Sequence, residues 1–228
     1  MFAWTSEDLQ ILRLSVSVAA LATLASLGPA IGVATLLARR RFWGHSAVNA
    51  IVHLPLVLPP VVTGYFLLRA FGTRGPIGAW LADTLGLVFA FRWTGAAIAA
   101  AVMGFPLMVR AIRLSIESVD ARLEEAASTL GAAPFWTLMT VTLPLALPGI
   151  LSGMVLGFAK ALGEFGATIT FVSNIPGETQ TLALAIYTLT QSPGGDARVL
   201  RLAALSIVVS LVALVISEAL SRRVTAKR

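Results

Sequence analysis

The sequence predicts an all-α integral membrane protein, a polytopic bundle of about five transmembrane helices. Hydrophobic residues fill 57% of the 228 positions and charged residues only 12%, whereas soluble domains carry about 25% charged residues. Several apolar runs approach or exceed the ~20 residues that a helix needs to cross the hydrocarbon core. These runs lack the regular alternation of membrane β-strands, so the spans are expected to be helical.

Apolar length places the spans along the chain. The five expected spans cover residues 11–38, 48–70, 94–109, 145–172 and 199–220. Two further apolar stretches, 78–91 and 181–189, are too short to cross alone, so they are re-entrant or interfacial, or one of them supplies a sixth helix. The N-terminus carries Glu7 and Asp8 without a basic region, which favours a retained first span over a cleaved signal. No linker divides the chain, so residues 1–228 are expected to form one transmembrane domain.

Basic residues cluster beside the expected spans, so membrane orientation explains the net charge of +6 better than a nucleic-acid surface does. Three clusters share one side of the membrane: Arg39, Arg40 and Arg41; Arg110, Arg113 and Arg122; and Arg222, Arg223, Lys227 and Arg228. By the positive-inside rule this side is the cytoplasm, with the N-terminus outside and the C-terminus inside. The opposite side carries arginines of its own, namely Arg13, Arg69, Arg74, Arg92, Arg198 and Arg201.

The second span contains Pro55, Pro59 and Pro60, and Gly64 follows them. Each proline removes a backbone donor, so we expect the helix to be kinked or interrupted where its freed carbonyls face protein or water. One interpretation is that this segment lines a translocation pathway. The other is a bent helix with no lining role.

The segment 115–144 is polar enough to leave the membrane, yet it is rich in helix formers. Asp120 suits a helix N-cap, and Glu124 and Glu125 suit the positive end of the helix dipole that follows. Gly131 supplies the left-handed position at which helices often end. The segment therefore predicts a short helix in the cytoplasm.

The apolar residues of this short helix follow three- and four-residue spacings and form one narrow face; they are Leu123, Ala126, Ala127 and Leu130. A second short helix is expected to begin at Pro134. At about ten residues the first helix is below the ~12–15 needed for independent stability, so the bundle or a partner must hold it. From periodicity alone, an ordinary interhelical hairpin remains the alternative.

The same segment resembles the EAA loop of prokaryotic ABC importer permeases. The match rests on the whole spacing, which comprises Glu125, Ala126, Ala127, Gly131, Val141, Leu143 and Pro144. In that family the loop forms a coupling helix that docks in a cleft of the ATP-binding subunit. The resemblance therefore implies a coupling site made of Glu124, Glu125, Ala126, Ala127, Gly131, Leu143 and Pro144.

Four further stretches are similar to the permeases of molybdate importers; they cover residues 53–68, 104–113, 162–171 and 175–188. Sulfate and thiosulfate permeases are similar through the loop, and tungstate importers are close as well. The resemblance implies a type I ABC importer permease fold and translocation of an oxyanion, most simply molybdate. It also implies a bacterial inner-membrane location, a homodimer, two ATP-binding subunits and a periplasmic oxyanion-binding protein.

The fourth expected span carries Lys160 and Glu164, although each charge at mid-membrane costs roughly 2.5–3.5 kcal/mol. Both must therefore face protein or water, and a spacing of four places them on one helix side, where they can pair. Two alternatives stay open: a neutralised pair that fixes helix packing, or groups lining a water-filled passage for an oxyanion. The candidate pathway residues are Lys160, Glu164, Pro59, Pro60, Thr63 and Thr168, although the threonines also suit simple bonds to helix carbonyls.

No motif in the sequence indicates catalysis. G-x-x-x-x-G-K-[ST] is absent, so ATP hydrolysis, with its ATP-Mg, is expected on a separate subunit, and no cofactor is expected on this chain. His45 and His53 are isolated, and there is no cysteine for a thiolate metal site. A secondary transporter and a membrane-embedded enzyme are the rival classes. The spacing of the loop motif disfavours the first, and the lack of a convergent catalytic set disfavours the second.

Overall fold

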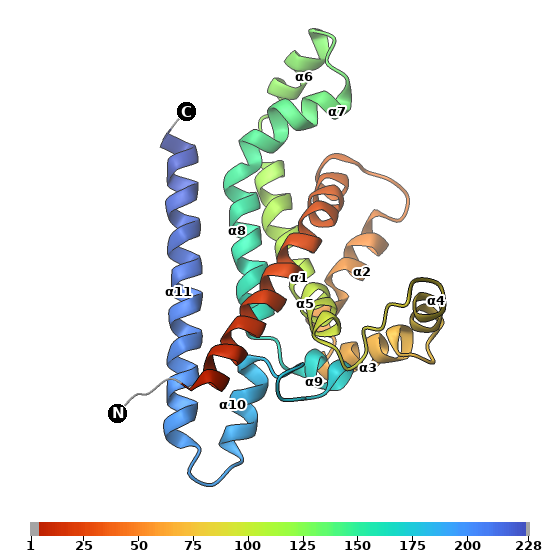
Figure 1. The fold of residues 1–228 in the computed structure, drawn as a ribbon. Coiled ribbons are helices and arrows are strands. Elements are labelled where there is room, and N and C mark those ends of the chain that lie inside the picture. Colours follow the sequence, from red (N-terminus) through yellow and green to blue (C-terminus); the bar gives the residue numbers. More distant parts are fainter. Residues whose placement is uncertain (1–4, 227–228) are drawn as a thin grey trace.

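The computed structural model describes residues 5–226, and helices make up its regular structure there (Figure 1). In chain order they are α1 (Ser6–Arg39), α2 (His45–Val57), α3 (Pro60–Phe71), α4 (Pro76–Leu85), α5 (Trp93–Glu117), α6 (Ala121–Thr129), α7 (Pro134–Thr137), the π-helix η1 (Leu138–Thr142), α8 (Leu143–Leu162), α9 (Gly166–Val172), α10 (Leu182–Thr190) and α11 (Asp196–Ala226). The all-α expectation is confirmed. Of the basic tail, Lys227, Arg228 and the side chains of Arg222 and Arg223 lie outside the described part.

Four helical segments in this part are long and apolar enough to cross a membrane: α1, α5, the continuous run Pro134–Leu162, and α11 over Asp196–Ile216. The pair α2 and α3 passes the same test together but is bent by 112°. Counting this bent pair as one broken span gives five crossings, which agrees with the expected number. The interruption falls at Pro59, as the prolines of the second span predict.

Helices α5 and α8 pack closely because the α8 face that meets α5 is lined with glycines. A Cβ placed on Gly153 would lie 3.1 Å from the carbonyl oxygen of Met108, and one on Gly149 would lie 2.1 Å from the Cβ of Ser115. On the α5 side of this contact, Gly104 lies against the backbone of Gly157 in α8. In lipid, helices associate through such close packing, because an apolar solvent supplies little hydrophobic driving force. This pair is the centre of the bundle, and α1 packs against both of its helices.

The third expected span, 94–109, is shorter than the helix that forms it, because α5 continues to Glu117. No glycine or proline follows Pro106 in this helix, so nothing in the backbone ends it at the membrane surface. An i,i+4 ion pair between Arg113 and Glu117, at 2.7 Å, stabilises the last turn of the helix. Arg110 and Arg113 therefore lie on the last turns of the helix, beside the loop that follows.

The expected span 145–172 is wrong as a single helix. Helix α8 ends at Leu162, three residues form a break, and α9 starts again at Gly166 and packs against α3. The break begins at Gly163, and the carboxylate of Glu164 accepts a hydrogen bond from the amide of Ala167 at 3.0 Å. A side chain that accepts from a free amide in the first turn of a helix favours a new helix start at that point. The spacing of apolar residues along the sequence carries no sign of such a start.

The two short apolar stretches form the short helices α4, with ten residues, and α10, with nine. At 1.5 Å per residue neither is long enough to cross ~30 Å of hydrocarbon, so neither supplies a sixth crossing. Helix α10 is fixed to the bundle by the amide of Leu182, which donates to the Ser15 hydroxyl at 2.7 Å.

The molecule has two distinct ends (Figure 1). At one end the α6–α7 hairpin projects beyond the bundle, on the side toward which α1 and α11 run as they finish. The first turn of α1 and the loop before α11 lie at the other end, where Arg198 donates to Asp8 at 2.8 Å and to Glu7 at 2.7 Å. Two carboxylates thus pair with Arg198, one of the arginines that the sequence places on the side opposite the basic clusters.

Candidate coupling site and permeation elements

The projecting hairpin is built by local capping. The Asp120 side chain accepts from the amide of Arg122 at 3.0 Å and so caps α6, as expected from the sequence. Gly131 adopts φ +86°, a left-handed conformation that ends the helix at low cost. Pro134 then occupies the first turn of α7. These features set a nine-residue helix across the end of the bundle.

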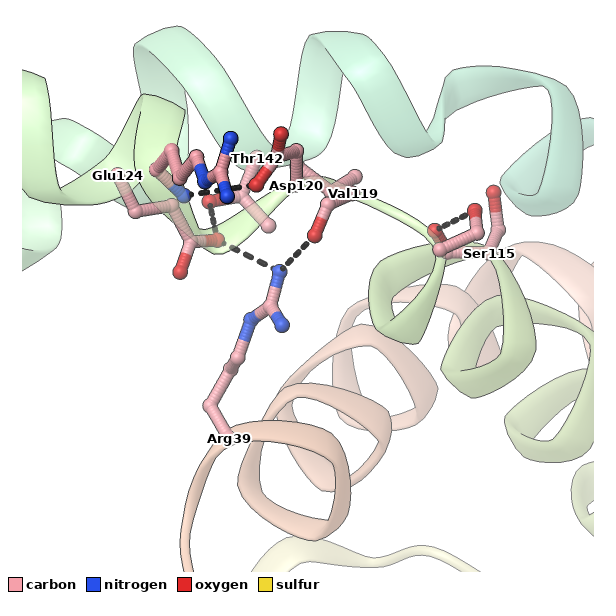
Figure 2. Close-up of polar contacts among 8 residues, drawn as sticks. Arg39, Ser115, Val119, Asp120, Glu124 and Thr142 are labelled. Carbon is pink, nitrogen blue, oxygen red and sulfur yellow. Dashed lines mark hydrogen bonds and ion pairs between the residues drawn. The ribbon is translucent and has the colours of Figure 1, made fainter.

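One carboxylate oxygen attaches α6 to two other elements, as Figure 2 shows. Oε1 of Glu124 accepts from Nη2 of Arg39 at 2.9 Å and from the hydroxyl of Thr142 at 2.6 Å. The same Nη2 also donates to the backbone oxygen of Val119 at 3.2 Å, just before α6. Glu124 therefore faces the bundle, while the neighbouring Glu125 is exposed.

The outer side of the hairpin is apolar and exposed. Leu130 is 89% exposed, and Leu123, Phe135 and Trp136 are also exposed. A groove of about 650 Å³ runs beside it between the end of α1 and the hairpin, and Glu124 and Glu125 are among its lining residues. Since large apolar side chains on a water-facing element usually mark an interaction surface, this hairpin is the candidate docking site.

Of the other residues in the predicted coupling set, Ala126 and Ala127 lie on α6, whereas Leu143 and Pro144 follow the hairpin. Leu143 and Pro144 start α8, directly after the π-helix Leu138–Thr142. A π-helix is rare and often lies at a functional site. The sequence analysis did not find it, and no sequence pattern for it is apparent.

Lys160 lies in the last turn of α8, and Glu164 lies in the break between α8 and α9. Nζ of Lys160 contacts Oε2 of Glu164 at 2.6 Å, and Oε1 accepts from the amide of Ala167. Glu164 is only 2% exposed, whereas the side chain of Lys160 is 29% exposed. Both carboxylate oxygens of Glu164 therefore have partners within the protein.

The other candidate pathway residues gather where α3 meets α9. A Cβ on Gly166 would lie 2.7 Å from the Cβ of Pro60, and one on Gly64 would lie 2.5 Å from the carbonyl oxygen of Ala167. Thr63 and Thr168 are buried on these two helices. Pro59 precedes α3 at the break. The structure thus places these residues on two adjoining helices, at a different level of the bundle from the coupling set (Figure 1).

Sequence reasoning missed the roles of Arg39 and Thr142 in this arrangement. It used Arg39 only as an orientation charge, and it gave Thr142 no role. Their bonds to Glu124 span 85 and 18 residues of sequence. Within residues 5–226 no group of three or more His, Cys, Asp or Glu side chains has the geometry of a metal site.

Two relatives share more than half of their aligned residues with this chain. The molybdenum transport system permease protein ModB of Haemophilus influenzae is 54% identical over 220 residues, which are 96% of this chain and 96% of that protein. The protein of the same name from Escherichia coli K12 is 56% identical over 218 residues, 96% of this chain and 95% of that protein.

The fold also matches a solved structure, the inward-facing MetNI methionine ABC transporter. Its TM-score is 0.71 at 16% identity, and the alignment covers 97% of this chain and 99% of that chain. At this identity the likeness describes the fold alone, which is that of an ABC importer permease.

The sequence model of the family described as binding-protein-dependent transport system inner membrane component matches residues 30–226. Such a component is the non-catalytic membrane subunit of an ABC importer, binds no cofactor of its own, and works with an ATPase and a binding protein. The match covers most of the chain, from the last part of α1 to the end of α11. This protein therefore belongs to the binding-protein-dependent transport system inner membrane component family, as a multi-pass inner-membrane permease subunit.

Proposed function

We propose that this permease subunit carries molybdate across the inner membrane, with residues 1–228 forming one transmembrane domain. The observation that supports the substrate is the identity of 54% and 56% to molybdenum transport permeases, over nearly the full length of each protein. A periplasmic oxyanion-binding protein selects the anion, and the permease lets it pass. Tungstate, sulfate and thiosulfate are the competing substrates, because they too are tetrahedral dianions.

The coupling set is Glu124, Glu125, Ala126, Ala127, Gly131, Leu143 and Pro144. Of these, the residues on the exposed side of α6 dock on the ATPase, and the exposed Leu130 lies beside them. Closure of two ATP-binding subunits moves the paired coupling helices and switches access from one membrane face to the other. This assignment rests on the projecting hairpin, whose apolar side has no cover within the described residues.

The assembly that fits this mechanism contains two copies of the chain, two ATP-binding subunits and one binding protein. Helix α11 exposes a long apolar face, which is suited to contact a second copy of the chain or lipid. This face includes Leu200, Ile207, Leu211 and Val215. Mass measurement of the purified complex distinguishes one permease chain from two.

The N-terminus lies outside and the C-terminus in the cytoplasm. This orientation puts the hairpin and Arg39 on the side of the ATPase, in agreement with the positive-inside rule. The chain has no cysteine, so single cysteines report sidedness directly. Ser128→Cys should react with an impermeant maleimide only after the membrane is opened, whereas Ser192→Cys should react in intact spheroplasts. The reverse pattern overturns the orientation.

Lys160 and Glu164 shape the pathway by holding the break between α8 and α9, and they do not bind the anion themselves. Lys160 neutralises Glu164, and Glu164 starts α9, whose close contact with α3 positions Pro59, Pro60, Thr63 and Thr168. A dianion would gain little from a lysine whose charge a buried carboxylate already cancels.

Uptake by reconstituted vesicles tests the function. Proteoliposomes containing the permease and its ATPase should accumulate molybdate only with ATP and a molybdate-loaded binding protein, as measured by elemental analysis of the vesicles. Tungstate and sulfate, each offered with its own binding protein, are the substrate controls. Equal uptake of sulfate would overturn the molybdate assignment, and uptake without ATP would favour a secondary transporter.

A further inference from the structure

Three elements of the permease meet at a single oxygen atom. Oε1 of Glu124 on α6 accepts from Arg39, the last residue of α1, and from Thr142, the last residue of the π-helix before α8. The side chains of Arg39 and Glu124 are only 24% and 22% exposed, and Thr142 is 2% exposed. This partial burial limits the competition of water for these bonds.

Other contacts between α6 and the bundle are sparse. None of the residues of α6 is buried, and Leu123 on its apolar side is 48% exposed. A nine-residue helix is not stable alone, so the bonds of Glu124 decide where α6 sits relative to α1 and α8. A force applied to α6 by another subunit reaches these two long helices through the same carboxylate.

We propose that Arg39 and Thr142 are positioning residues that pass movement of the coupling helix to α1 and α8 through Glu124. The two adjacent glutamates then have different roles: the exposed Glu125 is free to contact the ATPase, and Glu124 bonds to the bundle. This inference deepens the proposed function and rests on it. It assigns to Arg39 a part in energy coupling that its position at the end of a span does not suggest.

The first test measures how many molybdate ions enter proteoliposomes per ATP hydrolysed. Arg39→Ala and Thr142→Val should lower this ratio by about fivefold or more, while the ATPase still co-purifies and hydrolyses ATP, because the docking side of α6 is unchanged. Arg41→Ala and Thr140→Val are matched controls and should keep the parent ratio. Arg41 is exposed, and the Thr140 hydroxyl bonds only the backbone of its own turn.

Rescue and additivity distinguish this role from general destabilisation. Arg39→Lys and Thr142→Ser keep a donor for Glu124, so both should recover most of the ratio. The double variant Arg39→Ala/Glu124→Ala should be no worse than Glu124→Ala alone, because both changes break the same bond. An unchanged ratio in Arg39→Ala, or losses that add independently, would overturn the proposal.

A second readout does not depend on the transported ion. Spin labels at Ser128→Cys on α6 and Leu36→Cys on α1 report the separation of the two helices in the purified complex with its ATPase. When ATP binds, the parent and Arg41→Ala should keep a narrow distance distribution, whereas Arg39→Ala should broaden it. If the distance distribution also stays narrow in Arg39→Ala, the bond between Arg39 and Glu124 is not what links α6 to α1. Absent molybdate uptake by the parent would overturn the proposed function but leave this result readable.

Discussion

Helices α5 and α8 meet along glycines in the bundle, whereas α6 is attached to the same bundle by the carboxylate of Glu124. In the first region the backbones approach so closely that a Cβ on Gly149 would lie 2.1 Å from the Cβ of Ser115. In the second, two hydrogen bonds to one oxygen bridge three elements. Close backbone packing holds α5 and α8 together, whereas hydrogen bonds to Glu124 hold α6 against the bundle.

The difference follows from the solvent of each region. In lipid, close van der Waals contact stabilises helix pairs, and a gap of about 0.5–1 Å already removes roughly a quarter to a half of that attraction. The bonds of Glu124 to Arg39 and Thr142 are partly shielded and charge-assisted, and such bonds contribute about 1.5–3 kcal/mol each. The bundle is therefore held along whole helix faces, whereas the position of the hairpin depends on a few bonds to one carboxylate. The predictions below test this contrast, from the largest expected effect to the smallest.

Filling the glycine face should unfold the bundle. Gly149→Val places two methyl groups where even a Cβ has no room, so overpacking should cost at least about 1–3 kcal/mol and lower the yield of monodisperse protein. Thermal unfolding in detergent, followed by tryptophan fluorescence, measures the loss. Gly28→Ala is the control, because nothing lies within 4 Å of its Cβ position in α1. Equal melting temperatures for both variants would disprove the packing role.

Distorting the hairpin should abolish transport without unfolding the bundle. Gly131→Pro cannot adopt φ +86°, because the proline ring holds φ near −65°, so the turn between α6 and α7 must rearrange. We expect uptake near background with an unchanged melting temperature. Gly131→Asn, which tolerates the left-handed region, should keep most of the activity. Normal uptake by Gly131→Pro would show that the hairpin does not couple ATP to transport.

Removing Lys160 should destabilise the break between α8 and α9 moderately. Lys160→Met leaves the buried Glu164 carboxylate with only the Ala167 amide. Loss of one partner of a buried pair costs about 3–5 kcal/mol, and the partial exposure of Lys160 lowers our expectation to about 1–3 kcal/mol.

The double variant Lys160→Met/Glu164→Gln is the matched control for this pair. It should recover part of the loss, because the neutral amide oxygen still accepts from Ala167 without needing a counter-charge. Thermal unfolding and molybdate uptake are both measured. A change in apparent anion affinity with unchanged stability would instead favour a site that touches the anion.

The smallest effect is expected at the exposed tip of the hairpin. Leu130→Ser should leave stability within about 0.5 kcal/mol, because the side chain is 89% exposed in the permease alone. Burial of a leucine on docking contributes about 1.5–3 kcal/mol, so affinity for the ATPase should fall by about tenfold or more. Titration of labelled permease with its ATPase measures this affinity. Unchanged binding would place the docking surface elsewhere on the hairpin.

Local features of the molecule could be read from the sequence, whereas the joins between distant elements could not. Asp120 and Gly131 were recognised because capping depends on residues within four positions of each other. The interruption at Pro59 was recognised because proline acts on its own turn. The break at Gly163 was missed, because the four-residue spacing of Lys160 and Glu164 also suits one continuous helix. The bond from the Ala167 amide to Oε1 of Glu164, which marks the start of α9, is visible only in the structure.

By itself, the amino-acid sequence determined that the chain is a membrane-spanning helical bundle with a projecting, capped hairpin. Apolar run length, proline and cap residues act over a few neighbouring positions, and the chain carries that information locally. Only the tertiary structure decided that Arg39 meets Glu124 across 85 residues and that Arg198 meets Asp8 across 190. Such pairs depend on how the helices cross, and the crossing depends on packing along whole helix faces.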